Sequence, residues 1–481
     1  MAEGGIDHAV QLRLREGDLT LAGALRAERV QLAADAGALR LQGATLDARA
    51  AEGGVVRLMA AGDLVLDVTS RIDARSTAMG ASGGDVLLAS ANGRVQPQAG
   101  ATVDARGDDA GDGRVVLRAA RSADGTTLQV GPLQPADLQA GEVVLEAVRV
   151  YRQVTVDSET RDIATIGSGS SALVGSGTAR SGQLGQASVL ADSNAFMASA
   201  AGALGTLGVG SADRGRVSLR AGVEVQAAGN LSVVSDWTLQ GARAGGEAGL
   251  LTLRAAGDLA INGSISDGFA SAAANAALSS NATAWSYRLA AGADLAAADP
   301  LATGSGDSGS LSIAAGRTVR TGAGSIDLAA AQNMRFAAGS GSTSAGQAYV
   351  AGALRTGTDA DAANALFAGH AAAARPTFTE RGGRLTLQAG RDIEAPEASQ
   401  LVTHWLWRSG VLPATGADQG LYARSAHLGW WSQFAQFQQT LGAFGGGSIR
   451  VRAGRDVVNL QAMASTAGWA DSRVPAVDAI A

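Results

Sequence analysis

The sequence predicts an all-β solenoid, in which short strands of successive coils stack over one another around a shared core. The first observation is a repeated segment, GGRLTLQAGRDI at residues 382–393 and GGSIRVRAGRDV at residues 446–457. The second is that apolar and polar residues alternate within each copy, which is typical of a strand with one buried face. The third is size, because a single copy is too small to bury its own apolar face and must stack on its neighbours.

The copies share three apolar columns, represented by Leu385, Leu387 and Ala389 in one copy. The same columns return as Leu251, Leu253 and Ala255, and again as Ile449, Val451 and Ala453. Further copies occupy residues 53–66, 215–225, 309–319 and 324–334. An antiparallel sandwich or barrel built from hairpins would show the same alternation. The return of the same columns favours the solenoid.

A small polar or acidic residue follows the first apolar column at a constant distance of seven residues. This position is held by Asp63, Glu224, Asp258, Thr318, Asn333, Asp392 and Asp456. Asp and Asn side chains accept a hydrogen bond from the backbone two residues further on, and a neighbouring Gly supplies positive φ. We therefore expect a tight turn there.

Composition limits the classes of function. The chain has 66 Gly in 481 residues and 4% aromatic residues, which indicates many turns and a narrow aliphatic core. A formal net charge of −6 disfavours nucleic-acid binding. The absence of Cys excludes disulfide, thiolate–zinc and iron–sulfur chemistry. No window approaches 18 apolar residues, so no membrane span is expected.

Along the chain we expect five regions. These are β-helix coils at 1–157, an irregular or helical excursion at 158–214, coils at 215–395 with Ala/Gly/Ser-rich loops at 270–299 and 339–379, a Trp-rich helical insertion at 396–445, and a final coil with a tail at 446–481. Helical spacing of apolar residues predicts one helix over 187–207 and another that carries Trp430, Phe434, Phe437 and Leu441 on one stripe.

Several of these segments resemble one family. The LTLRAAGDLAI and LTLQAGRDI blocks, the SDWTL before them, and the Trp-rich segment followed by GGGSIRVRAGRDV resemble the filamentous haemagglutinin family of two-partner secretion exoproteins. The resemblance is strongest over residues 215–460, and this segment is similar to the C-terminal part of the family's repeat region. The family's N-terminal secretion domain and its Asn-Pro motifs have no counterpart in this sequence.

The resemblance implies a right-handed parallel β-helix that adheres to host cells or other bacteria. It implies export by a Gram-negative bacterium, and hence a secreted or cell-surface location. The implied partners are an outer-membrane two-partner-secretion transporter and a cell-surface receptor or glycan. No apolar signal core opens the sequence, so we expect a fragment whose export signal lies on residues outside it.

Arg106, Gly107 and Asp108 form the first candidate binding site. In an exposed loop this tripeptide engages integrin-type receptors, with the Asp on a bound cation and the Arg in an acidic pocket. The alternative is a chance tripeptide in a turn. Asp108, Asp109 and Asp112 also suggest calcium, but Ala stands at two positions of the helical calcium-loop pattern that need oxygen ligands, so a plain acidic turn is favoured. We expect no metal and no cofactor.

An aromatic cluster is the second candidate. It comprises His404, Trp405, Trp407, Trp430, Trp431, Phe434 and Phe437. Exposed faces of Trp405, Trp407, Trp430 and Trp431 would stack on sugar rings or anchor a partner. The alternative is a local core that joins the inserted segment to the coils.

Catalysis finds little support in the sequence. The four His residues are scattered, and no zincin, nucleophile-elbow or P-loop motif occurs. We therefore expect a protein that is not an enzyme. Three hypotheses remain open: an adhesive rod segment, a passive stalk of a contact-dependent inhibition toxin, and a β-helical polysaccharide-active enzyme.

Overall fold

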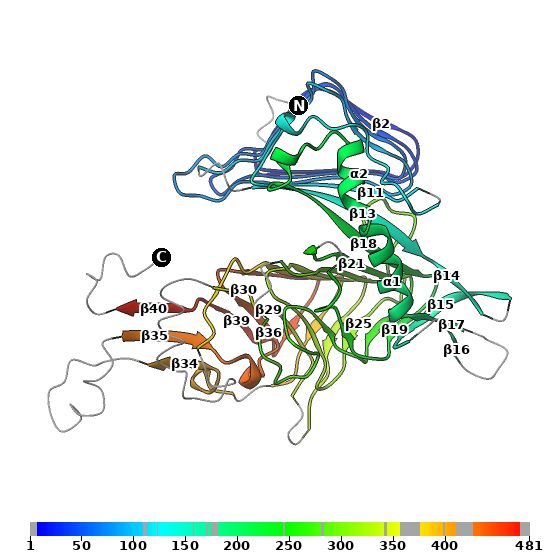
Figure 1. The fold of residues 1–481 in the computed structure, drawn as a ribbon. Coiled ribbons are helices and arrows are strands. Elements are labelled where there is room, and N and C mark those ends of the chain that lie inside the picture. The colour runs from blue at the N-terminus through cyan, green and yellow to red at the C-terminus, as the bar shows by residue number, and fades with distance from the viewer. Residues whose placement is uncertain are drawn as a thin grey trace.

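The computed structural model is dominated by β-strands (Figure 1). It describes residues 7–108, 113–122, 124–156, 158–169, 172–174, 181–243, 246–279, 283–340, 344–355, 376–397, 400–409 and 427–471. Within these ranges the chain forms two α-helices, α1 (Gln186–Met197) and α2 (Ala200–Thr206). An all-β fold is therefore confirmed.

One parallel sheet of 12 strands runs through the molecule, and we call it the long sheet. Its strands in spatial order are β1 (Ala9–Leu14), β3 (Arg29–Ala34), β5 (Val55–Ala60), β8 (Asp85–Ser90), β11 (Arg114–Ala120), β13 (Glu142–Tyr151), β18 (Val217–Ala227), β21 (Leu250–Ala255), β24 (Ser286–Ala291), β27 (Ile326–Ala330), β32 (Arg384–Ala389) and β37 (Ser448–Ala453). Since every coil supplies one strand to it, the order in space follows the order in sequence.

The first part of the chain builds an N-terminal body, strands β1 to β13, around one core. A second parallel sheet lies across this core from the long sheet, with strands β2 (Leu19–Arg26), β4 (Leu39–Asp47), β6 (Leu64–Leu66), β7 (Arg71–Asp73), β9 (Val95–Pro97), β10 (Thr102–Asp104) and β12 (Leu138–Gln139). The core between the sheets consists of Leu, Val, Ile and Ala with a few larger side chains, as the low aromatic content predicts.

A C-terminal body follows, strands β14 to β40 with β18 shared between the two bodies, and has two further parallel sheets. One contains β15 (Glu159–Gly167), β17 (Ser181–Gly185), β19 (Leu231–Val233), β22 (Leu259–Ile261), β25 (Leu311–Ile313), β28 (Met334–Phe336), β33 (Ile393–Glu394) and β38 (Val457–Val458). The other contains β20 (Trp237–Thr238), β23 (Ile265–Ser266), β26 (Thr318–Thr321), β29 (Gln347–Val350), β36 (Leu441–Phe444) and β39 (Ala462–Ser465).

The C-terminal body also contains short antiparallel strand pairs. They involve β14 (Gln153–Val156) with β15, β16 (Ala172–Val174) with β17, β30 (Ala353–Leu354) with β31 (Thr379–Glu380), and β35 (His427–Ser432) with both β34 (Leu406–Ser409) and β40 (Gly468–Asp471). These pairings lie outside the long sheet, so they do not interrupt its parallel order.

The apolar columns predicted from the repeats are confirmed by the strand register. Leu385 of β32 pairs with Ile326 of β27 on one side and with Ile449 of β37 on the other. Leu251 of β21 pairs with Tyr287 of β24, which pairs in turn with Ile326. Because these pairs are parallel, the hairpin sandwich is excluded for the described repeats.

The turn column differs from its prediction in two respects. Its side chains bond to the next coil rather than to the backbone two residues on: Asp258 Oδ1 accepts from the backbone N–H of Ser310 at 2.8 Å, and Asn333 Oδ1 from that of Asp392 at 3.2 Å. Glu224 and Thr318 do not belong to the column, because Glu224 lies inside β18 and Thr318 begins β26.

The helix predicted over 187–207 is present but is divided at Ala198 and Ser199 into α1 and α2. Val189 packs into the core of the C-terminal body, whereas Phe196 and Leu204 pack into that of the N-terminal body. The helices therefore cover the junction between the two cores. The excursion at 158–214 is not purely irregular or helical, because β15 and β17 join a main sheet of the C-terminal body.

Three predicted irregular or helical regions are corrected. The loop at 270–299 contains β24, whose Tyr287, Leu289 and Ala291 fill the core. The loop at 339–379 contains β29 and β30, while its residues 356–375 lie outside the described ones. The insertion at 396–445 forms strands β34, β35 and β36 in its described residues. The apolar residues predicted to share a helical stripe lie instead on β35, on or just after a 3₁₀ turn (Phe434–Gln436), and on β36.

The two bodies lie against each other through the outer faces of the long sheet (Figure 1). The first half of β18 contributes Val217 and Leu219 to one core and the second half contributes Val223 and Val225 to the other. On the outer face, Arg288 donates to Glu146 at 2.9 Å and Arg384 to Asp85 at 3.3 Å. The long sheet thus doubles back on itself, and the molecule is not the single rod that the repeats suggest.

Candidate functional site

A repeated Asp-Ala-Arg triplet ends one strand in each of three successive coils of the N-terminal body. The triplets are Asp47-Ala48-Arg49, Asp73-Ala74-Arg75 and Asp104-Ala105-Arg106, whose Asp residues are the last residues of β4, β7 and β10. The residue before each Asp and the Ala within each triplet are buried in the core. Alternation along an extended chain therefore directs each Asp and each Arg to the outside.

Within each triplet the Arg holds its own Asp with two hydrogen bonds. Arg49 donates to Asp47 at 2.8 Å from both Nε and Nη2, and Arg75 donates to Asp73 at 3.0 and 2.7 Å. Arg106 repeats the contact with Asp104 at 2.9 and 2.6 Å. This two-pronged geometry is the strongest arrangement of an Arg–carboxylate pair.

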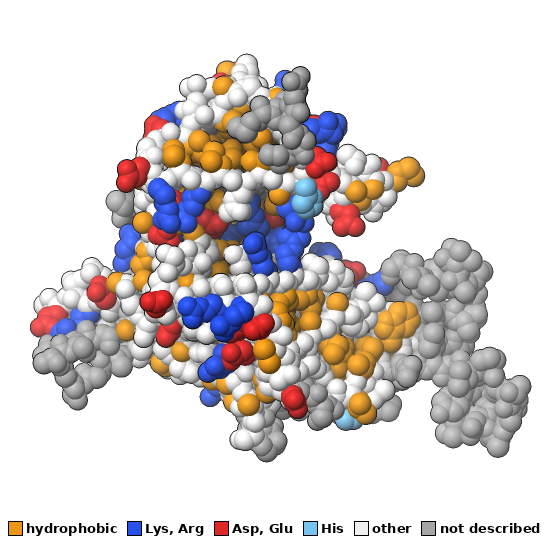
Figure 2. Space-filling model, turned by 180° about the vertical axis from the view of Figure 1, so that it is seen from behind, with side chains coloured by type: hydrophobic (Ala, Val, Ile, Leu, Met, Phe, Trp, Pro, Cys, Tyr) orange, Lys and Arg blue, Asp and Glu red, His pale blue; other side chains and the backbone are white. Residues whose placement is uncertain are grey.

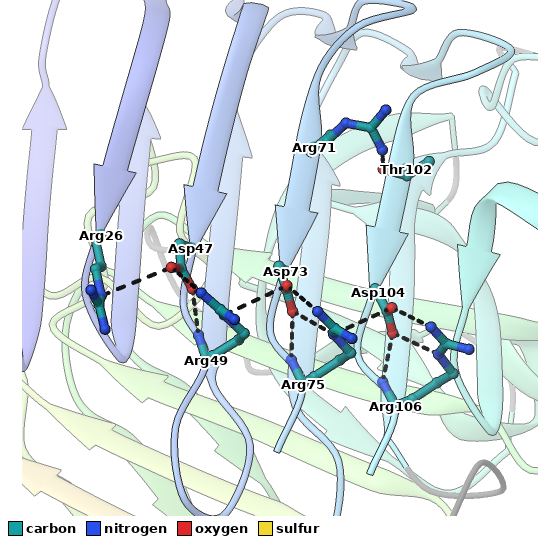
Figure 3. A network of polar contacts seen from close by, with 9 residues as sticks. All are labelled: Arg26, Asp47, Arg49, Arg71, Asp73, Arg75, Thr102, Asp104 and Arg106. Carbon is teal, nitrogen blue, oxygen red and sulfur yellow. Dashed lines mark hydrogen bonds and ion pairs between the residues drawn. The ribbon is translucent and has the colours of Figure 1, made fainter. Parts of the chain in front are cut away.

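The triplets are also joined from coil to coil, and we call the whole row the Asp–Arg ladder (Figure 3). Arg49 Nε lies 3.6 Å from Asp73 Oδ2, and Arg75 Nε lies 3.5 Å from Asp104 Oδ2. Burial raises the pKa of Asp104, but the hydrogen bonds and charges of Arg106 and Arg75 outweigh it and hold that pKa below its usual range. Asp104 is therefore ionised at neutral pH and holds its two arginines by charge as well as by hydrogen bonds.

The predicted Arg-Gly-Asp tripeptide continues this ladder. Arg106 is its last member and is already bound to Asp104, while Asp108 Oδ2 accepts from the backbone N–H of Gly80 at 2.8 Å. An acidic receptor pocket would have to replace Asp104 as the partner of Arg106. Both functional ends of the tripeptide are thus engaged within the molecule.

A hollow of about 380 Å³ nevertheless opens beside the tripeptide. It is lined by Arg75, Ser76, Thr77, Ala78, Met79, Arg106, Gly107 and Asp108. Met79 is 92% exposed at its edge. Asp109 and Asp112 of the calcium hypothesis lie outside the described residues, and the described residues contain no group of three or more His, Cys, Asp or Glu that could hold a metal ion.

The aromatic cluster is largely a local core. Trp405 is 1% exposed, and its ring meets those of Phe437 and Phe444 edge-on at centroid distances of 5.2 and 5.7 Å. Phe434 also packs there, 5.7 Å from Phe269. The cluster fills the space beside β29 and β36, so Trp405 presents no face to a sugar.

The other three Trp candidates lie on a small antiparallel sheet. Trp431 is 3% exposed and packs against Phe378, whereas Trp407 and Trp430 are half-buried. Trp407 pairs directly with Trp431, so these two share one face of the sheet and Trp430 lies on the other. The structure therefore does not place the four Trp side chains on one open surface. His404, which accepts from Trp407 Nε1 through its backbone oxygen, is exposed.

The sequence reasoning missed a buried charge cluster between the two bodies. Glu146 lies between Arg118 at 3.0 Å and Arg288 at 2.9 Å, and Glu224 lies between Arg118 and Arg254. Burial opposes ionisation of Glu224, but Arg118 and Arg254 lower its pKa to about 2. The available signal was a set of Arg and Glu residues at the polar positions of neighbouring repeats, which alternation alone assigns to solvent.

Comparisons with protein-family models, curated proteins and solved structures find no match to this chain. In the described residues no helix has both the length and the apolar character needed to cross a membrane.

Proposed function

We propose that the chain is a structural segment of a secreted or surface-held exoprotein of the filamentous haemagglutinin type. Its coils form a right-handed parallel β-helix, and its role is to hold an adhesive surface at the outside of a Gram-negative cell. The main support is the long sheet, in which successive coils contribute parallel strands in matching register. The proposed partners are an outer-membrane two-partner-secretion transporter and a receptor or glycan on another cell.

Bonds from coil to coil suit a mechanical role. Strand hydrogen bonds, the turn-column side chains and the Asp–Arg ladder all connect one coil with the next. Separating two coils therefore requires several contacts to break together. Absence of Cys also suits a chain that crosses an envelope unfolded, since no disulfide forms on the way.

Attachment of protein-coated beads to cells tests the adhesive role. Beads that carry the full chain are expected to bind epithelial or Gram-negative cells in a saturable way, while beads with the heat-unfolded chain do not. Asp108→Glu examines the tripeptide, and Asp307→Glu, at an exposed position in the other body, is the matched control. Loss of attachment with Asp108→Glu alone would locate adhesion at residues 106–108; equal loss with both variants would contradict that location.

A passive stalk is the second candidate, and two observations favour it. Trp405 and Trp431 are buried, and Arg106 is held by Asp104, so the residues chosen as binding candidates largely serve the fold. If the folded chain fails to attach beads to any tested cell type, the adhesive proposal is wrong and the stalk is retained.

A further inference from the structure

Four arginines converge at one edge of the interface between the two bodies. Arg29 of β3 and Arg57 of β5 belong to the N-terminal body, and Arg384 of β32 and Arg450 of β37 belong to the C-terminal body. Gln31 pairs with Arg57 and Thr386 pairs with Arg450 in the register. Arg29 and Arg57 are therefore diagonal neighbours on one outer face, and Arg384 and Arg450 are diagonal neighbours on the other.

A cross-body contact brings these two faces together. Arg384 Nη1 lies 3.3 Å from Asp85 Oδ2 on β8, the strand next to β5. Val55 pairs directly with Asp85, so Arg57 stands diagonally beside this carboxylate. Figure 2 shows blue side chains gathered where the two bodies meet, and since the sequence has no Lys they are all Arg.

Positive charge is in excess at this edge. Arg384 is shared between Asp85 and Asp327, at 3.3 and 3.6 Å. Among the described residues, neither Arg29, Arg57 nor Arg450 has a carboxylate within 4.0 Å. Burial and then the charges of Arg29, Arg384 and Arg57 lower the pKa of Arg450, which means that these guanidinium groups act on one another.

The rest of the interface does not share this excess. Glu146 and Glu224 each lie between two arginines, and Asp294 accepts from both Arg13 and Arg15. Like charges that face each other without a counter-ion destabilise the contact between the faces. The four-arginine edge has Asp85 and Asp327 as its carboxylates, both of them shared with Arg384, so its positive charge is only partly compensated.

We infer that Arg29, Arg57, Arg384 and Arg450 form a site for a compact multivalent oxyanion of the phosphate class, held between the two bodies. Guanidinium groups present planar forks of N–H donors that match the oxygens of a phosphate, and a phosphate has enough acceptors to bridge donors from both faces. A chloride ion has the charge but not the bridging geometry. Binding there strengthens the contact between the bodies, and this inference does not depend on the proposed function.

Titration of the full chain with inorganic phosphate tests the site. Calorimetry is expected to show saturable binding, and phosphate is expected to raise the Tm above that in sodium chloride of equal ionic strength. Arg57→Gln combined with Arg450→Gln removes one donor from each face and is expected to weaken binding by at least about tenfold. The same variant is expected to be at least as stable as the wild type without phosphate, because repulsion is relieved.

Arg71→Gln combined with Arg335→Gln makes the same change of charge at exposed positions away from the edge and should leave phosphate binding unchanged. Arg450→Gln alone, on the exposed last strand of the long sheet, repeats the test if the double variant is poorly folded. Glucose 1-phosphate distinguishes the source: binding indicates a phosphorylated saccharide, and failure to bind indicates the free ion. Absence of saturable phosphate binding to the wild type, or equal phosphate binding by the Arg57→Gln/Arg450→Gln and Arg71→Gln/Arg335→Gln variants, overturns the inference.

Discussion

Glu224 is the residue whose replacement best tests how the two bodies hold together. It is 3% exposed and accepts hydrogen bonds from Arg118 of the N-terminal body, from Arg254 at 3.1 Å and from Gln226 at 2.6 Å. Glu224→Gln keeps the shape of the side chain but removes the negative charge. Arg118 and Arg254 then stay buried with less compensation, so the folded state should lose stability.

The magnitude follows from the pKa of Glu224. Its pKa falls from 4.5 to about 2 in the folded protein. Each pKa unit corresponds to roughly 1.4 kcal/mol, so the ionised carboxylate contributes about 3 kcal/mol. Because the folded pKa is the lower one, this contribution is complete above the unfolded pKa and is lost as the pH falls from about 5 towards 2.

Denaturant unfolding followed by Trp fluorescence measures the effect. At about pH 7 we expect Glu224→Gln to lower the free energy of unfolding by about 3 kcal/mol, and at about pH 3 we expect most of that difference to disappear. Glu52→Gln, at an exposed turn, is the matched control and should change little. A difference that is the same at both pH values, or no difference at neutral pH, would refute this account of the buried charge cluster.

Three further changes test the stacking of the coils and the buried aromatic core. Gly54→Ala should lower the Tm strongly, because a Cβ there would lie 1.7 Å from the carbonyl oxygen of Ala48. Gly229→Ala is the control and should leave the Tm unchanged, because a Cβ at residue 229 would have no atom within 4 Å. Equal Tm values for the two variants would contradict the close packing. Trp405→Ala should cost about 3–5 kcal/mol in urea unfolding, and a cost near zero would contradict its burial. Asp73→Asn should cost at most about 1 kcal/mol, measured at low and high salt, and a cost that salt does not reduce would argue against an ionic ladder.

Much of the coil architecture was predictable from the sequence because it depends on local alternation. Leu385, Leu387 and Ala389 had to face a core, and the register with Ile449 and Val451 follows from keeping that face buried in each coil. The Asp–Arg ladder was predictable in principle, since the Asp-Ala-Arg triplet recurs in the sequence, and Arg106 belongs both to its last copy and to the Arg-Gly-Asp tripeptide.

The Trp-rich segment shows where local patterns fail. Trp430, Phe434, Phe437 and Leu441 have helical spacing, yet they lie on a strand, a 3₁₀ turn and a second strand. Phe434 and Phe437 pack with Trp405 in an aromatic core. Leu441 packs in the main core of the C-terminal body. Helical periodicity records only that these residues are apolar at certain intervals. Packing against Tyr349 and Phe269, which are distant in the sequence, decides the conformation.

The sequence by itself determined the parallel coils, because alternation and repetition specify which side chains of adjacent coils must lie over one another. Only the tertiary structure decided that the long sheet doubles back. Arg118, Glu146 and Glu224 occupy positions that alternation assigns to water, and they are buried because a second body, built by residues further along the chain, covers the same face. No local pattern records a contact between the outer faces of coils so far apart in the sequence.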